Sequence, residues 1–364
     1  MSSAPAQHYL TLDGLRGVAA LAVMAMHCGP WFNPEGIFAR AYLAVDFFFL
    51  LSGFVVAHAY QPRLDQGRLS RGRFVVARVV RLYPLILLGM LIAGAFLSLR
   101  WMSGRRDLPL DMIIDAFARG VALIPTLTPN PVGPEEAYPL DGPLWSLFFE
   151  LVVNIIYGLA FRWMTTRVLV ALVVAGLAGM VAAVLVHGHL DVGVSPHTFF
   201  WGVARVTFGF FGGVLIHRLI TGRRLTLPAL GPLTATVLLV LLFCMPREWP
   251  GRGVVDLVCA VLVFPLVLLF SLGSKPGPVV SRLCRVSGDL SYPIYVLQRP
   301  LFWWIGSVYL AFDITDWPAP IPGLIAVVVV TLGSWIALKA WDEPVRKALA
   351  PLTRSRPRPP GPVP

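Results

Sequence analysis

The sequence predicts an all-α, polytopic transmembrane helical bundle, and three observations support this fold class. The 364 residues are 57% hydrophobic and only 13% charged, with a mean hydropathy of +0.73, whereas soluble domains contain about 25% charged residues. Apolar stretches of about 20 residues, the length that crosses a hydrocarbon core, recur along the chain. Lys and Arg gather in alternate loops between these stretches.

We expect about ten transmembrane helices. No Lys or Arg precedes Arg16, and the first apolar stretch carries polar residues, so we expect it to be retained as a helix rather than cleaved as a signal. In chain order, the ten stretches are 11–31, 41–60, 82–99, 143–162, 167–187, 197–218, 228–246, 253–272, 288–311 and 321–341.

The distribution of cationic residues orients these helices. If the N-terminus is cytoplasmic, 20 of the 30 Lys and Arg residues lie in cytoplasmic segments and 7 in outer segments. Because cytoplasmic loops carry an excess of Lys and Arg, both termini are predicted to be cytoplasmic. The same bias explains the net charge of +11 without a nucleic-acid partner.

The connecting segments suggest one domain and a tail. The cytoplasmic segment 61–81 is rich in Arg, and the external segment 100–142 is long, with a predicted short helix at 110–124 on the membrane surface. We assign residues 1–352 to the transmembrane domain and expect the Pro- and Arg-rich residues 353–364 to be disordered.

The four cysteines show neither CxxC spacing nor histidine partners. We expect them to be small buried apolar residues, and we predict no metal site. They are Cys28, Cys244, Cys259 and Cys284.

Five predicted helices carry polar residues at the middle or outer depth of the membrane. An ionisable group at a helix centre costs about 2.5–3.5 kcal/mol on insertion scales, so these residues require an explanation. One interpretation is a functional site, and the other is a set of structural ion pairs in which Arg205 and Arg299 neutralise acids. The residues are His27, Asp46, Glu150, Arg205, Gln298 and Arg299.

His27 is the candidate catalytic base because imidazole can accept a proton near neutral pH. Asp46 lies near the outer end of the second predicted helix, at the same membrane depth as His27, and is expected to orient the imidazole. Arg16 lies eleven residues before His27, which places both on one helix face, roughly 16 Å apart. A long anionic donor along this face would have its charge near Arg16 and its reactive end near His27.

Arg78 and Arg81 open the third helix with i, i+3 spacing, so both guanidinium groups project from one side of it. Two such groups at the cytoplasmic surface suit a phosphate or pyrophosphate. The alternative is an ordinary basic flank that contacts lipid headgroups.

Six motifs in chain order resemble acyltransferase family 3, the membrane acyltransferases of bacterial surface polysaccharides and some secondary metabolites. The likeness spans nearly the whole chain. The motifs are Leu12–Ala20 with His27, Val45–Phe54, Arg78–Pro84, Trp145–Leu147 with Glu150, Ser291–Tyr295, and Glu343–Pro344.

The resemblance implies O-acyl transfer in the cell (inner) membrane from cytoplasmic acyl-CoA, with acetyl as the expected group and no permanently bound cofactor. The acceptor would be a carbohydrate or a lipid-linked sugar. His27 would be the base, with Asp46 or Glu150 beside it. Gln298 stands where the family commonly shows a His, which leaves His27 as the sole histidine candidate. Donor handling is assigned to Arg16, Arg78, Arg81 and Tyr83, and oxyanion stabilisation or support to Ser52, Arg205, Tyr292, Gln298 and Arg299.

Other readings of the sequence remain open. Buried charges and a basic cytoplasmic entrance also suit a transporter or flippase of a lipid-linked or phosphorylated glycan, although no inverted repeat is visible. A non-catalytic scaffold would leave the buried His and acids unexplained. Within the enzyme reading, a covalent acyl-enzyme on His27 or Ser52 is a variant of direct transfer.

Overall fold

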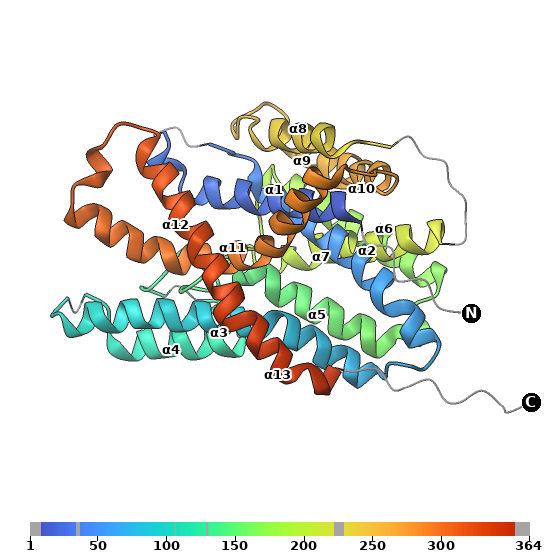
Figure 1. Cartoon of the computed structure of the whole chain (residues 1–364), viewed down its shortest axis with the longest axis horizontal. Helices are drawn as coiled ribbons and strands as arrows, with labels where there is room; N and C mark the ends of the chain where they lie inside the picture. Colours follow the sequence, from blue (N-terminus) through green and yellow to red (C-terminus); the bar gives the residue numbers. More distant parts are fainter. Residues whose placement is uncertain (1–8, 34–36, 106, 129, 222–228, 354–364) are drawn as a thin grey trace, which may run out of the picture.

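The computed structural model describes residues 9–33, 37–105, 107–128, 130–221 and 229–353. No strand occurs among these residues, and helices run along most of the longest axis of the molecule (Figure 1), which confirms the all-α class. The helices are α1 (Leu10–His27), α2 (Ala44–Asp65), α3 (Arg71–Met102), α4 (Leu110–Ala122), α5 (Leu144–Ala160), α6 (Thr166–His187), α7 (Trp201–Ile220), α8 (Pro232–Phe243), α9 (Arg252–Val258), α10 (Phe264–Ser271), α11 (Pro278–Ala311), α12 (Ile321–Ala337) and α13 (Glu343–Thr353).

Eight helical segments of the described chain are long and apolar enough to cross a membrane. Each of the ten predicted stretches coincides with a helix, but two of these helices do not meet both criteria, so the count of ten is not confirmed. α8 is apolar but has only 12 residues. α11 has 34 residues, and its apolar character is reduced by Gln298, Arg299 and two interior prolines.

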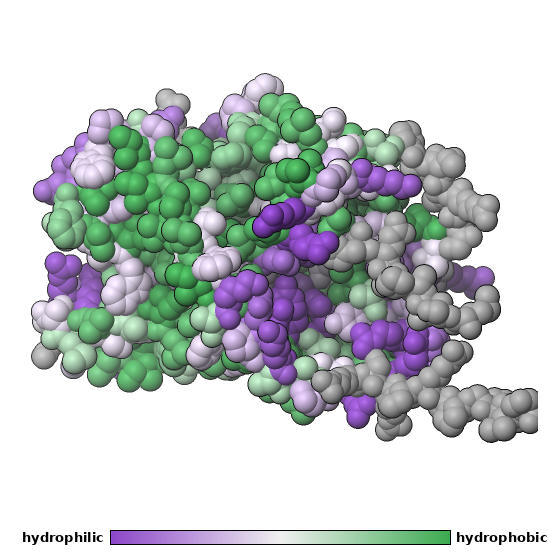
Figure 2. Space-filling model, viewed as in Figure 1, coloured by the Kyte–Doolittle hydropathy of each residue, from purple (hydrophilic) through white to green (hydrophobic). Residues whose placement is uncertain are grey.

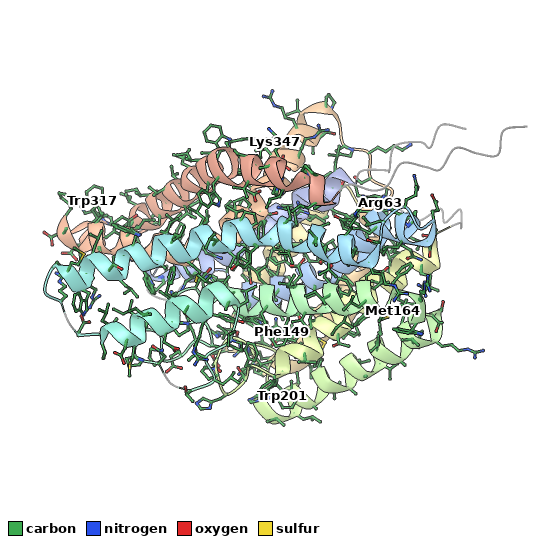
Figure 3. The ribbon with its side chains drawn as sticks, turned by 90° about the horizontal axis from the view of Figure 1, so that it is seen from below. Arg63, Phe149, Met164, Trp201, Trp317 and Lys347 are labelled. Atoms are coloured by element: carbon green, nitrogen blue, oxygen red, sulfur yellow. The ribbon has the colours of Figure 1, made fainter. Side chains whose placement is uncertain are left out.

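The loops alternate between two ends of the bundle. Figure 3 places Arg63 and Met164 toward one end and Trp317 toward the other. We call the end that carries the α2–α3 loop, residues 66–70, the inner end, since it is the predicted cytoplasmic side, and the opposite end the outer end. Thr353 ends α13, and the remainder of the predicted tail, 354–364, lies outside the described residues.

α4 occupies an unexpected position. The sequence predicted a helix at 110–124 on the membrane surface, and the helix is present, but it runs beside the outer half of α3 (Figures 1 and 3). A Cβ atom at Gly94 would lie 2.9 Å from the Phe117 ring, and one at Gly120 would lie 2.4 Å from the Met90 sulfur. One face of α4, with Ile113, Ala116 and Gly120 buried, therefore packs on α3, a contact that the sequence did not predict.

Lipid-facing surface is visible as exposed apolar stripes. On α12, large side chains at Leu324, Val328, Leu332 and Trp335 are exposed at helical spacing, and Figure 2 shows hydrophobic surface there. Such a stripe suits hydrocarbon rather than water.

Three cysteines are buried as predicted, but Cys244 is exposed because it lies just past the end of α8.

α2 and α7 pack so closely that glycine is required between them. A Cβ atom at Gly53 would lie 1.9 Å from the Phe210 carbonyl oxygen, and one at Gly213 would lie 2.1 Å from the Leu50 carbonyl oxygen. Small residues let transmembrane helices approach backbone to backbone. This contact fixes α2, which carries two candidate site residues, against the rest of the bundle.

We expect Gly53→Ala to destabilise the protein by about 1–3 kcal/mol, the usual cost of overpacking. Backbone atoms of α7 cannot move aside as the end of a side chain can. The measurement is the thermal unfolding midpoint in detergent. Gly212→Ala is the matched control, since its Cβ atom would meet only the end of Leu50, at 3.7 Å. Equal midpoints for the two variants would contradict this account of the contact.

Candidate active site

A cavity of about 340 Å³ opens between α1, α2, α3, α5 and α11 in the inner half of the bundle. Figure 2 shows hydrophilic side chains gathered around a hollow between α11, α13 and α2. The cavity brings together half of the predicted site residues from five separate helices. Those that line it are Arg16, Ser52, Arg78, Arg81, Glu150 and Tyr292.

The three arginines of the cavity are held by different partners. Arg16 donates from Nε to Ser291 Oγ at 2.8 Å and from Nη2 to the Gly288 carbonyl at 2.8 Å. Arg81 lies over the Tyr292 ring, 5.1 Å from its centroid, and 4.0 Å from the Asp342 carboxylate. The Tyr292 hydroxyl donates to the Leu82 carbonyl. The guanidinium groups are therefore oriented by neighbours while they still face the cavity.

Glu150, on α5, connects two other helices of the cavity, α2 and α3. Its Oε1 accepts from Ser52 Oγ at 2.7 Å and from Arg78 Nη2 at 3.2 Å. This arrangement corrects the expectation that Glu150 lies beside His27, because the carboxylate contacts Ser52 and Arg78 instead. The contact between Arg78 and Glu150 is a charge-assisted hydrogen bond, which is stronger than a bond between neutral groups.

His27 ends α1 and does not line the cavity. Its Nδ1 atom lies 3.2 Å from Oε1 of Gln298. The Gln298 amide nitrogen donates to the Tyr295 carbonyl at 3.0 Å, which leaves its oxygen to accept from His27. In the neutral tautomer that this acceptor favours, Nδ1 carries the proton and Nε2 keeps its lone pair. Gln298 is thus the residue that contacts the imidazole and sets its orientation.

Asp46 does not orient His27 either, so the prediction that this carboxylate holds the imidazole is wrong. Its carboxylate is buried and pairs with Arg205 through two bonds, 3.0 Å to Nε and 2.8 Å to Nη2. Arg205 also donates to the carbonyls of Val192 and Tyr42, at 2.7 and 3.0 Å. The pair joins α2 to α7, so the interpretation in which Arg205 neutralises an acid as a structural ion pair describes these two residues.

Two aromatic side chains line the cavity near Gln298, the residue that contacts His27. Phe48 and Tyr295 line the cavity and contact each other edge to face, with ring centroids 5.5 Å apart. The Tyr295 hydroxyl lies 2.7 Å from Ser146 Oγ. Tyr295 is one helical turn before Gln298, so α11 passes from the cavity to the histidine within a few residues.

Arg299 and Tyr83 face other parts of the molecule. Arg299 donates from Nη2 to Glu136 at 2.6 Å and lines a second pocket at the outer end. The Tyr83 hydroxyl donates to the Val121 carbonyl at 2.7 Å, which ties α4 to α3, and the residue is not part of the cavity lining. The sequence predicted that Arg299 neutralises an acid of the buried set and that Tyr83 handles the donor. It did not predict that 100–142 returns alongside α3 and contacts both residues.

Two acids of the external segment were not singled out individually by the sequence. Burial raises the pKa of Glu136, against the opposing effect of Arg299. Burial also raises the pKa of Asp141 well above its usual range, and Glu136 adds to this. Neither oxygen of Asp141 has a hydrogen-bond partner among the described residues. Both residues lie in a segment that the sequence predicts to be an external loop, so their burial was not predicted.

A further buried network lies between α9 and the start of α2. Asp256 accepts from Arg40 at 3.0 Å, from the Tyr42 hydroxyl at 2.9 Å and from the Leu190 amide at 3.0 Å. Arg40 and Asp256 are both fully buried. Asp256, an acid inside the predicted apolar stretch 253–272, could have indicated a buried ion pair. Its partner was not predicted, because Arg40 falls in a predicted outer loop. The network fixes helix ends and contributes no residue to the cavity.

Comparison with known proteins places this geometry in context. The model of a family described as an acyltransferase domain, that of acyltransferase family 3, matches residues 9–339, a range that contains every predicted site residue. Protein 2 in the picA locus of Rhizobium radiobacter is 40% identical over 195 residues, which cover 50% of this chain and 98% of that protein. Acyltransferase MdmB of Streptomyces mycarofaciens is 30% identical over 161 residues, 42% of this chain and 39% of that protein. No solved structure matches.

Proposed function

The chain belongs to acyltransferase family 3 and is a membrane acyltransferase, and from this premise we propose that it moves an acyl group, with acetyl expected, from acyl-CoA at the inner end to a hydroxyl of a carbohydrate or lipid-linked sugar at the outer end. One observation carries the proposal. The imidazole of His27 contacts Gln298, whose amide nitrogen donates to the carbonyl of Tyr295, a residue that lines the arginine-lined cavity.

The cavity suits the donor. Arg16, Arg78 and Arg81 bring three guanidinium groups to one opening at the inner end, where planar forks can bind the phosphates of acyl-CoA. The remaining lining is largely apolar, from residues such as Val45, Leu51 and Leu147, and it suits the pantetheine arm. The thioester would then lie toward Phe48 and Tyr295, where the cavity ends.

Direct transfer requires one base and no cofactor. The lone pair on His27 Nε2 takes the proton of the acceptor hydroxyl, whose oxygen attacks the thioester carbonyl. The C–S bond breaks, and the thiolate of CoA receives the proton from the imidazolium. Charge on the carbonyl oxygen needs a donor. Of the predicted donors, Ser52 and Tyr292 line the cavity, where their hydroxyls donate to Glu150 and to the Leu82 carbonyl. Arg205, Gln298 and Arg299 are hydrogen-bonded elsewhere.

The test is transfer of label. Proteoliposomes that contain the protein would receive acetyl-CoA with a labelled acetyl group on the inner face and candidate glycans on the outer face. We expect label in the glycan. Movement of unmodified glycan without label would instead favour the transporter reading, and a mass spectrum of the native polysaccharide with and without the protein would name the modified sugar.

Removal of the arginines should weaken donor binding. We expect Arg81→Gln to raise the Kd for acetyl-CoA by about tenfold or more, since a hydrogen bond to a charged group contributes about 1.5–3 kcal/mol. Arg78→Gln should act on binding and on turnover, because it also leaves Glu150 without its cation. Binding of labelled acetyl-CoA to detergent-purified protein measures the Kd without an acceptor.

Arg73→Gln is the control for these variants. It lies on the same helix, near the same end, but outside the cavity lining. If all three variants bound acetyl-CoA as the unchanged protein does, Arg78 and Arg81 would not bind the donor. They would then be an ordinary basic flank at the cytoplasmic end of the helix.

A further inference from the structure

A second pocket, of about 580 Å³, lies at the outer end between α3, α11 and the loop 131–139. Trp303 lines it and is held by Phe96, with ring centroids 5.7 Å apart. Arg299 and Glu136 line it opposite the apolar side chains and are joined by a bond of 2.6 Å. An aromatic face beside a few fixed polar groups is the usual composition of a small-molecule site.

The polar groups of the pocket are built in. Glu136 packs on Gly142, where a Cβ atom would lie 2.9 Å from its Oε1, so the carboxylate has little freedom. Both Arg299 and Glu136 remain partly exposed, at 30% and 18% of the side-chain surface. A ligand can therefore reach one donor and one acceptor whose positions are set before it binds.

The charges of the pocket select the class of ligand. Among its described lining residues, two are cationic and three anionic: Arg100, Arg299, Asp107, Glu135 and Glu136. Arg100 is already paired with Asp107, and Arg299 with Glu136. A phosphorylated or otherwise strongly anionic ligand would meet no surplus of positive charge. A neutral ligand with hydroxyl groups fits this composition.

The pocket also approaches the candidate base. Arg299 directly follows Gln298, which holds His27. Phe302 lines the pocket and belongs to the apolar cluster with Met24 and Cys28, which lie before and after His27 in the sequence. Along α11, therefore, Tyr295 faces the inner cavity, Gln298 binds the imidazole and Arg299 faces the outer pocket.

We propose that this outer pocket binds a neutral sugar residue of the acceptor, with its ring against Trp303 and its hydroxyls on Glu136 and Arg299. The assignment rests on the proposed acyl transfer for its meaning, but binding can be measured without it. The sugar enters from the outer end and presents a hydroxyl toward His27, whereas the donor arrives from the inner end.

Protection of an engineered thiol tests the pocket directly. Ser307 lines the pocket and is exposed, so Ser307→Cys in a Cys244→Ser background gives one exposed thiol among the described residues. We expect neutral methyl glycosides at high millimolar concentration to slow its reaction with a membrane-impermeant maleimide. Glucose 6-phosphate should have little effect.

Trp303 and Trp304 form a matched pair for the same assay. In that background, Trp303→Ala should raise the half-protecting glycoside concentration by up to about tenfold, the loss expected for one aromatic contact. Trp304→Ala should leave it unchanged, because the Trp304 indole bonds to the Ile92 carbonyl and does not line the pocket.

The outcomes separate this assignment from the proposed function. Acyl transfer to a glycan without protection by any glycoside would overturn the pocket and leave the function intact. Protection without transfer would support the pocket and count against the acyl-transfer proposal. Equal protection by glucose 6-phosphate would overturn the assignment to neutral sugars, and absence of both protection and transfer would contradict both proposals.

Discussion

Replacement of His27 by glutamine is expected to lower acyl transfer by about 10²–10⁴-fold, the range that a positioned general base contributes. Glutamine keeps a polar side chain of similar reach, so it can still contact Gln298, but it cannot accept the proton of an alcohol. Since His27 does not line the donor cavity, the Kd for acetyl-CoA should stay within about twofold of the unchanged protein, a difference under 0.5 kcal/mol.

The measurement combines turnover with labelled acetyl-CoA and donor binding on the same preparation. His187→Gln is the control, because it removes an imidazole at the outer end of α6 that contacts Trp201 and is no part of either pocket. An active His27→Gln variant would remove the base from the mechanism and direct attention to Ser52 with Glu150.

Gln298 gives a second readout of the same geometry. Gln298→Leu removes the acceptor that holds the proton on Nδ1, so the imidazole would lose its preferred tautomer while it keeps its basicity. Turnover should fall by less than in His27→Gln, with unchanged donor binding. An effect on donor binding instead would place Gln298 in the cavity wall and not behind the base.

The sequence predicted the depth of each polar residue but not the direction in which it points. Depth follows from the count of residues along a helix, and it correctly brought Arg16, Arg78 and Arg81 to one end. Direction depends on the rotation of each helix about its axis, which close packing decides. Gly53 and Gly213 draw α2 against α7, and that contact turns Asp46 toward Arg205 and away from His27.

The partners of Arg299 and Tyr83 could not be predicted for a related reason. Both contact the segment 100–142, through Glu136 and Val121. A hydropathy reading treats such a segment as a surface loop, whereas a short amphipathic helix such as α4 can return beside a long one when small residues such as Gly94 and Gly120 make room. The outer pocket exists because of this return.

The Asp46–Arg205 pair yields the largest stability effect we expect. Arg205→Met should destabilise the protein by about 3–5 kcal/mol, because it leaves a carboxylate buried without its cation. It also leaves the carbonyls of Val192 and Tyr42 without their donor. Thermal unfolding in detergent and the monodisperse yield on gel filtration measure the loss.

The double variant Asp46→Leu with Arg205→Met distinguishes a structural pair from a catalytic arginine. With both charges gone, no buried charge is left unpaired, so the unfolding midpoint should recover most of the loss of the single variant. Recovery is incomplete because the two carbonyls still lack a donor. If Arg205 only joins α2 to α7, activity returns with stability, since neither side chain lines the donor cavity. A double variant that is stable but inactive would return Arg205 to the role of oxyanion donor. A double variant no more stable than Arg205→Met alone would show that the two carbonyls without a donor, and not the unpaired carboxylate, cause the loss of stability.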